Sequence, residues 1–223
     1  VYFKAAWENE FPANRTEKAD FTNADGTTGT VDMMHQTNGF GYYATPGIEA
    51  LKMDYRNYAV DNEAGDNFES FRDADFSMYL IKADDTLDVQ NFLDNAEFTY
   101  GDVNASVPKF KVEYSAALDE ALQALGVQTA YDPENADLSA MLDPSGLPGQ
   151  QHFLDTVLHK TYIAVDEKGT EAAAVTAAMA GGAAPPERPE LIRSFAADSP
   201  FWFVIRDNAK GEILFAGRYE TAK

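Results

Sequence analysis

The 223-residue chain carries a formal net charge of -20, with 45% hydrophobic and 13% aromatic residues and no cysteine. A chain of this length and composition can bury one large core. The charge excludes general nucleic-acid binding, which requires a basic face, and the lack of cysteine excludes disulfides, thiolate metal sites and cysteine nucleophiles.

Strand-like segments dominate the first half of the chain. We expect a strand end followed by four short strands, at residues 1–7, 20–22, 27–34, 40–43 and 48–55. The acidic, apolar-poor stretch 56–75 predicts an exposed loop insertion. An acidic cation site is the alternative, although the Asp and Glu spacing matches no calcium loop. The first residues lie inside an apolar run without an initiator Met, so we expect the chain to begin within a longer protein.

The second half combines strands with two helices. Strands are expected at residues 76–81, 103–112 and 153–166, and a hairpin at 201–206 and 212–218. A short helix is expected after Asp85, with Leu87, Phe92 and Leu93 on its buried side. A second helix is predicted over 115–125, with an apolar face formed by Leu118, Ala121, Leu122 and Leu125 and with Gly126 ending it. No run of roughly 18 apolar residues occurs, so no membrane-spanning helix is predicted.

The stretch 166–186 is poor in large side chains yet lies between two strongly strand-like segments. Thr170 followed by Glu171 and an alanine run favours a short helix by intrinsic propensity alone. Because the segment has no apolar stripe, such a helix could not dock firmly on a core. We therefore expect an accessible loop of undecided conformation.

No catalytic or metal-binding motif stands out. The three histidines, His35, His152 and His159, are far apart in the sequence, and none has the spacing of a zinc site. Nucleophile elbows, phosphate loops and dinucleotide fingerprints are absent from the sequence. A paired acid and base could still be hidden among the many carboxylates. The sequence predicts a protein that is not an enzyme and that uses no metal or cofactor.

Several segments, taken in order and spacing, resemble the serpins along essentially the whole chain. They include residues 1–4 with Trp7, 27–28, 33–36, 136–139, 158–160, 166–174, 200–207 and 213–218. The resemblance implies an α+β serpin fold in one domain, 1–223, whose large central sheet accepts a loop as an inserted strand. It also implies that the N-terminal helices and two strands of that sheet are missing. The sequence departs from the family in the 56–75 insertion, in a shortened region at 84–104, and at Asp32, where a proline is expected.

The serpin resemblance implies that the small-residue loop is bait for a protease. After cleavage the loop inserts into the central sheet and traps the acyl-enzyme. Residues 169–180 contain no proline and no aromatic residue, and their small side chains suit entry between packed strands. The residues of the hinge are Glu167, Gly169, Thr170, Glu171, Ala172, Ala173, Ala174, Val175 and Thr176.

The reactive bond is expected between Ala183 and Ala184, at the family's distance from the hinge. Arg188 is the alternative, but Pro189 follows it, and trypsin-like enzymes cleave poorly before proline. A small residue at the cleaved position indicates an elastase-like or subtilisin-like target.

Three further residues match family positions that control opening of the sheet: Trp7, Lys109 and His159. Lys109 is expected to form an ion pair with Glu167; ordinary core or surface roles are the alternative for each of these residues. The resemblance further implies a target serine protease or, alternatively, a cysteine protease. It implies a monomer with no nucleic-acid or membrane partner, in an extracellular or secreted location. The alternative functions are a non-inhibitory serpin, acting as a carrier, chaperone or storage protein, or a truncated fragment without function.

Overall fold

The computed structural model describes residues 3–56, 74–141, 152–170 and 192–222. The chain divides into two compact units, one containing Val112–Tyr162 and the other containing Phe3–Lys111 with residues 163–222. Most of the expected acidic insertion, and the loop from Glu171 to residue 191, lie outside the described residues. One domain over the whole chain therefore stays a prediction.

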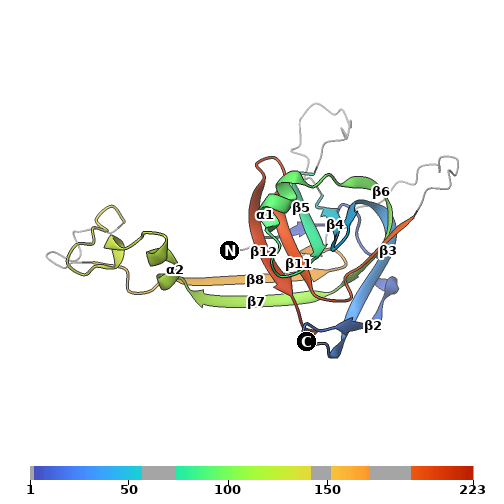
Figure 1. Cartoon of the computed structure of the whole chain (residues 1–223), viewed down its shortest axis with the longest axis horizontal. Helices are drawn as coiled ribbons and strands as arrows, with labels where there is room; N and C mark the ends of the chain where they lie inside the picture. The colour runs from blue at the N-terminus through green and yellow to red at the C-terminus, as the bar shows by residue number, and fades with distance from the viewer. Residues whose placement is uncertain (1–2, 57–73, 142–151, 171–191, 223) are drawn as a thin grey trace. The chain divides into compact units, whose positions relative to one another are not determined.

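Among the described residues, the larger of two sheets has eight strands, most of which are labelled in Figure 1. Seven strands follow one another across the sheet, and β2 (Thr16–Thr22) pairs with β3 outside this path. The seven are β10 (Arg193–Ala196), β6 (Thr99–Pro108), β3 (Thr28–Thr45), β4 (Ile48–Asp54), β5 (Phe76–Lys82), β11 (Phe201–Asp207) and β12 (Glu212–Tyr219). The pairs are antiparallel except that β10 lies parallel to β6.

Strand β3 corrects one sequence-based expectation. The separate strands predicted at 27–34 and 40–43 are one continuous strand of 18 residues. The polar residues between them remain in the ladder because β6 pairs with β3 without interruption from Met33 to Tyr42. The other edge of β3 changes partner, from β2 to β4, and this change produced the apparent break in the sequence pattern.

The smaller sheet has four strands among the described residues. Their order is β1 (Ala5–Ala6), β9 (Gly169–Thr170), β8 (Leu158–Asp166) and β7 (Phe110–Ala117). At the start of β7, the Phe110 ring lies 5.3–5.6 Å from the rings of Phe201, Phe203 and Tyr219 in β11 and β12. With two sheets and a few short helices, the fold is α+β, as predicted.

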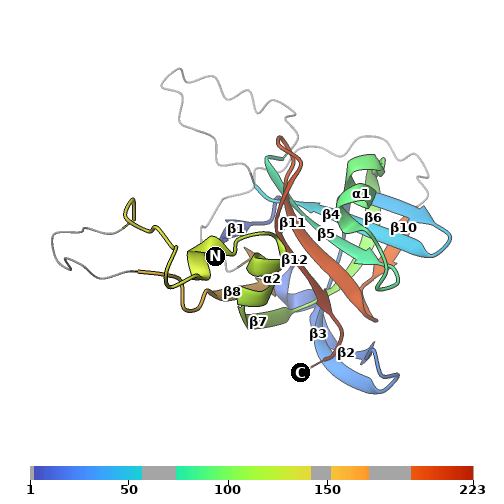
Figure 2. The same cartoon turned by 60° about the vertical axis from the view of Figure 1, so that its left-hand side comes forward.

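Helix α1 (Val89–Asn95) covers part of the larger sheet, as the turned view shows (Figure 2). Phe92 and Leu93 are buried against Ala50, Tyr79, Ile81 and Val204 of β4, β5 and β11. Phe92 and Leu93 lie on the buried side as predicted, but the helix begins only at Val89, so Leu87 precedes it. The Asp88 carboxylate accepts the N–H of Asn91 at 3.0 Å, which caps the first turn.

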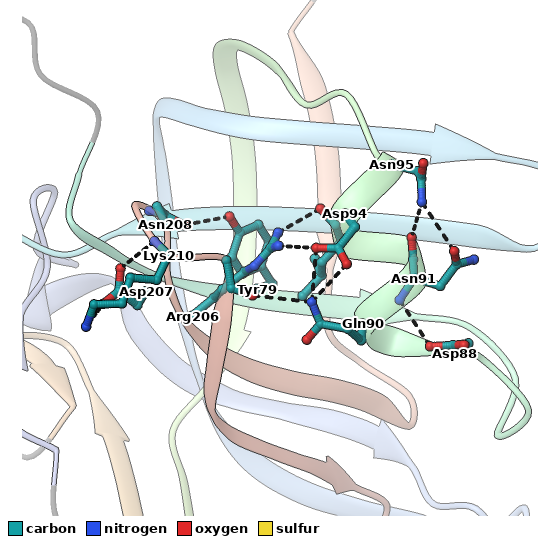
Figure 3. Close-up of polar contacts among 12 residues, drawn as sticks. Tyr79, Asp88, Gln90, Asn91, Asp94, Asn95, Arg206, Asp207, Asn208 and Lys210 are labelled. Carbon is teal, nitrogen blue, oxygen red and sulfur yellow. Dashed lines mark hydrogen bonds and ion pairs between the residues drawn. The ribbon is translucent and has the colours of Figure 1, made fainter.

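Polar contacts attach the same helix to the β11–β12 hairpin (Figure 3). The Arg206 guanidinium on β11 donates to the Leu93 carbonyl at 2.7 Å and forms an ion pair with Asp94. Gln90 donates to the Gly211 carbonyl in the hairpin turn at 3.3 Å. Arg206 therefore supplies donors to carbonyl and carboxylate groups near the C-terminus of α1, where a cation is favourable.

The second helix differs from its prediction. Residues 115–117 belong to β7, and α2 is limited to Asp119–Ala124 with no buried residue. Leu125 is 82% exposed, so the expected apolar face is not docked among the described residues. The chain before the helix is held by backbone pairing instead, with the Leu118 N–H donating to the Val157 carbonyl at 2.9 Å. Gly126, at φ +98°, ends the helix as expected.

No helix among residues 3–56, 74–141, 152–170 and 192–222 is long and apolar enough to cross a membrane.

Candidate functional site

The described beginning of the small-residue loop, Gly169–Thr170, lies inside the smaller sheet. β8 ends at Asp166, the chain reverses at Glu167 and Lys168, and β9 runs antiparallel to both of its neighbours. Thr170 is the partner of Val165 on one side and of Ala5 on the other. We call this place, formed by Gly169–Thr170 between Ala5–Trp7 and Val165–Asp166, the insertion site.

Trp7 holds the turn that leads into the insertion site. Its indole N–H donates to the Asp166 carbonyl, and its backbone N–H donates to the Lys168 carbonyl, both at 2.9 Å. The Phe11 N–H donates to the Glu167 carbonyl at 2.8 Å. Three successive carbonyls are thus satisfied by the segment that follows β1, which fixes the direction in which the loop leaves the turn.

Gly169 approaches the neighbouring strand too closely for any side chain. A Cβ at this position would lie 2.1 Å from the Ala5 carbonyl oxygen and 2.8 Å from the Ala6 Cα. Its φ of +153° is also one that residues with a side chain rarely adopt. The close contact is with backbone atoms, which cannot rotate away, so β9 can occupy this place only with glycine at 169.

Lys109 and Glu167 form the expected ion pair beside the turn. The Lys109 Nζ lies 2.8 Å from Glu167 Oε2, with the lysine side chain 39% exposed and the glutamate 16% exposed. Thr16, the first residue of β2, donates its hydroxyl to the other carboxylate oxygen at 2.9 Å. The Lys109 N–H donates to the Asp32 carbonyl at 2.8 Å, which fixes the lysine between the end of β6 and the start of β7.

The pKa values of both groups are shifted in the direction that favours their charged forms. The hydrogen bond to Glu167 is the main cause that raises the pKa of Lys109. Burial alone would raise the pKa of Glu167, but the hydrogen bonds from Lys109, from its own backbone N–H and from Thr16 together lower it below its ordinary value.

Thr170 is the first side chain of the loop inside the sheet, because Gly169 has none. It is 1% exposed, and its hydroxyl lies 2.6 Å from the hydroxyl of Tyr55. Tyr55 is itself buried and stacks on Trp7, with the rings 4.6 Å apart and inclined by 16°. Burial is the main cause that raises the pKa of Tyr55 well above its usual range, so the phenol stays neutral.

The structure brings together five of the residues that the sequence singled out: Trp7, Lys109, Glu167, Gly169 and Thr170. His159 lies toward the other end of β8 and is partly buried; its control of sheet opening stays a prediction. The remaining hinge residues, Glu171–Thr176, and the reactive bond Ala183–Ala184 lie outside the described residues.

Sequence reasoning missed Tyr55. The residue ends an alternating pattern in which Leu51, Met53 and Tyr55 are all buried. The sequence placed it only at the end of the strand expected at 48–55. A buried tyrosine hydroxyl requires a partner, and this requirement was the available signal; the identity of the partner needed the three-dimensional structure.

Comparison with known protein families shows to which family the chain belongs. Residues 1–221 match the family described as "Serpin (serine protease inhibitor)". The chain belongs to the serpin family.

This serpin chain is 34% identical to the human leukocyte elastase inhibitor over 230 residues, covering 99% of the chain and 56% of that protein. Its structure resembles Serpin48 of the insect Tenebrio molitor, with a TM-score of 0.67 and 26% identity over 98% of the chain and 54% of that structure. It also resembles human thyroxine-binding globulin complexed with thyroxine, with a TM-score of 0.72 and 26% identity over 99% of the chain and 55% of that structure. The chain spans about half the length of the curated relatives that it matches.

The close approach at Gly169 gives a first prediction. Gly169→Ala should lower the free energy of unfolding of this serpin by about 1–3 kcal/mol, because β9 must leave the sheet or the backbone of β1 must move. Gly39→Ala is the matched control, since a Cβ there meets nothing within 4 Å, and it should change stability by less than about 0.5 kcal/mol. Urea unfolding of both variants measures the difference, and equal losses would contradict the close contact at Gly169.

The ion pair gives a second prediction, on pH. A lowered pKa means that Glu167 stabilises the fold above its ordinary value of 4.5, and that this contribution is lost as pH falls through the lower, folded-state pKa. The raised pKa of Lys109 means that its contribution is full below 10.5 and is lost as pH rises through the higher, folded-state pKa.

Glu167→Gln should therefore lower the free energy of unfolding by about 0.5 kcal/mol near pH 7 and leave it unchanged near pH 3. The expected loss is small because Lys109 is partly exposed. Urea unfolding at the two pH values checks this. Glu8→Gln, at an exposed carboxylate after β1, is the control and should behave as wild type at both. A cost at Glu167 that is the same at both pH values would show that charge is not involved.

Proposed function

We propose that the complete protein containing this chain inhibits a serine protease by the serpin suicide-substrate route. The observation that carries the proposal is the position of β9, in which Gly169 and Thr170 already lie hydrogen-bonded between β1 and β8. A loop whose hinge starts as a strand in this place can continue to add residues to the same strand after cleavage. Family membership and the likeness to leukocyte elastase inhibitors support the same activity.

The covalent step joins the protease to the loop. The protease serine oxygen attacks the carbonyl carbon of Ala183, and the bond to the nitrogen of Ala184 breaks. An ester then links the protease to Ala183, while Ala184 leaves as a new amino terminus that takes up a proton. Insertion of the residues after Thr170 would carry the attached protease along the sheet and distort its active site before water hydrolyses the ester.

The side chains of the hinge favour rapid insertion. Thr170 faces the buried side, and strict alternation along a strand would place Ala172, Ala174 and Thr176 on that side as well. All are small, so little rearrangement of packed neighbours is needed as they enter. The prolines at 185 and 186 follow the reactive bond and would remain outside the sheet.

The target that we propose is an elastase-like or subtilisin-like serine protease, because the residue at the proposed reactive bond is alanine. The bond near Arg188 is the alternative, and it would suit a trypsin-like enzyme. A cysteine protease is the alternative target class. The ion pair of Lys109 with Glu167 would hold the mouth of the sheet closed, and His159 would act farther along, where the strands must part.

A non-inhibitory carrier is the second candidate function. The likeness to thyroxine-binding globulin, whose structure contains thyroxine, favours it. The small, nearly uncharged hinge favours inhibition, since bulky or charged hinge residues would impede insertion. A fragment without function is the third candidate. The monomeric state and the extracellular or secreted location stay predictions drawn from the family.

The proposal predicts a covalent complex. Incubation of the complete protein with pancreatic elastase should give a species that survives denaturing gel electrophoresis. Ala174→Arg, which puts a large charge on the buried side of the inserting strand, should abolish the complex while cleavage continues. Ala173→Arg, on the opposite side, is the matched control and should retain most of the complex. Cleavage of the wild-type protein with no stable complex would reject the proposal.

The position of the reactive bond gives a separate prediction. Mass spectrometry of the C-terminal fragment released by elastase should show a peptide that begins at Ala184. A fragment that begins at Pro189 would instead place the bond after Arg188 and would overturn the assignment of an elastase-like target.

A further inference from the structure

The buried hydroxyl pair at the insertion site has a geometry that the proposed insertion mechanism alone does not require. Backbone pairing of β9 needs no particular side chain at 170, yet Thr170 Oγ1 and Tyr55 Oη lie 2.6 Å apart and both residues are almost completely buried. Within the part of the chain that the structure describes, this is the one hydrogen bond formed by either hydroxyl. One hydroxyl donates and the other accepts, so each has the other as its hydrogen-bond partner.

Tyr55 is fixed on several sides. Trp7 stacks on one face of its ring, and Phe3 meets it edge-on at 5.0 Å. Its backbone N–H donates to the Phe76 carbonyl at 3.1 Å, and the next residue, Arg56, donates to the Ala6 carbonyl at 2.9 Å. The phenol thus cannot easily turn toward another partner, and its hydroxyl remains directed at the position of residue 170.

The two states of the hinge differ in what they offer this hydroxyl. With β9 in place, Thr170 completes its hydrogen bond. If residue 170 left the sheet, or entered without a hydroxyl, a buried phenol would lose its partner and keep its desolvation cost. This free-energy cost arises when the first side chain of the loop enters the sheet, before later residues of the loop can form stabilising contacts there.

We propose that Tyr55 is a positioning residue for the reactive loop, whose buried hydroxyl selects a hydroxyl-bearing side chain at 170 and commits the hinge to insertion. The proposal rests on the proposed function, because it assigns a role within loop insertion. It implies that valine at 170, which has the shape of threonine but no hydroxyl, impairs insertion, and that phenylalanine at 55 relieves the defect.

The test is a double-mutant cycle in the complete protein, with wild type, Thr170→Val, Tyr55→Phe and the double variant. The first measurement is the number of inhibitor molecules consumed per elastase molecule inhibited. Thr170→Val should raise this number about fivefold, the low end of what an unpaired buried hydroxyl costs. The double variant should return to within about twofold of wild type, because replacing both partners leaves no orphan group.

Two control variants separate hydrogen bonding from packing. Thr170→Ser keeps the hydroxyl and should behave close to wild type. Tyr79→Phe removes another buried tyrosine hydroxyl, one that donates to Asn208 at 2.9 Å, and should leave the inhibitor count unchanged. If Thr170→Val has no effect, or if the defects of the two single variants add in the double variant, the proposal is overturned.

A second measurement separates this proposal from the proposed function. The rise in unfolding temperature after cleavage of the loop reports insertion without any need for inhibition. If wild type forms no stable complex, the proposed function fails. The cycle in unfolding temperature still decides the role of Tyr55, since a smaller rise in Thr170→Val that recovers in the double variant supports it. Equal rises in all four proteins reject it.

Discussion

The pairing of two residues, Gly169 and Thr170, with strands on both sides is the constraint on which the site depends. It requires the backbone of β1 to approach so closely that no Cβ fits at 169. It also requires the turn at Glu167 and Lys168, whose carbonyls are taken by Phe11 and Trp7. Propensity would make the following alanine run helical, but a chain that already leaves the turn as a paired strand starts in extended backbone. Tertiary pairing, not local preference, therefore sets the conformation of Gly169 and Thr170.

The larger sheet supports this small one through the end of β4. Tyr55 pairs with Trp7 in an isolated bridge, and the Glu8 N–H donates to the Asp54 carbonyl at 2.9 Å. One wall of the insertion site is thus continuous with the sheet that holds most of the buried core. Under the proposed mechanism, a strand that parts from its neighbour to admit the loop would need one rigid side, and the stacking of Trp7 on Tyr55 would supply it.

The sequence predicted the parts of this structure that depend on local pattern or on family position. Strand β5, the β11–β12 hairpin and the buried side of α1 follow from apolar periodicity, and the Lys109–Glu167 pair followed from the serpin resemblance. Features set by contacts between distant segments could not be predicted. The continuity of β3 depends on its pairing with β6. The late start of α2 depends on the hydrogen bond from Leu118 to Val157. The partner of the Tyr55 hydroxyl is Thr170, which lies far along the chain.

Typical free energies indicate which of two contacts at the insertion site contributes more to its stability. An ion pair with a partly exposed lysine, such as Lys109 with Glu167, contributes at most about 1 kcal/mol, because water and salt screen it. Leaving a buried hydroxyl without a partner costs about 1–3 kcal/mol, because the group has already lost its water. The neutral pair of Thr170 and Tyr55 therefore outweighs the charged pair beside it. If the hinge inserts as we propose, insertion would depend mainly on a contact that neither pH near neutrality nor salt can change, and the ion pair would make a smaller contribution.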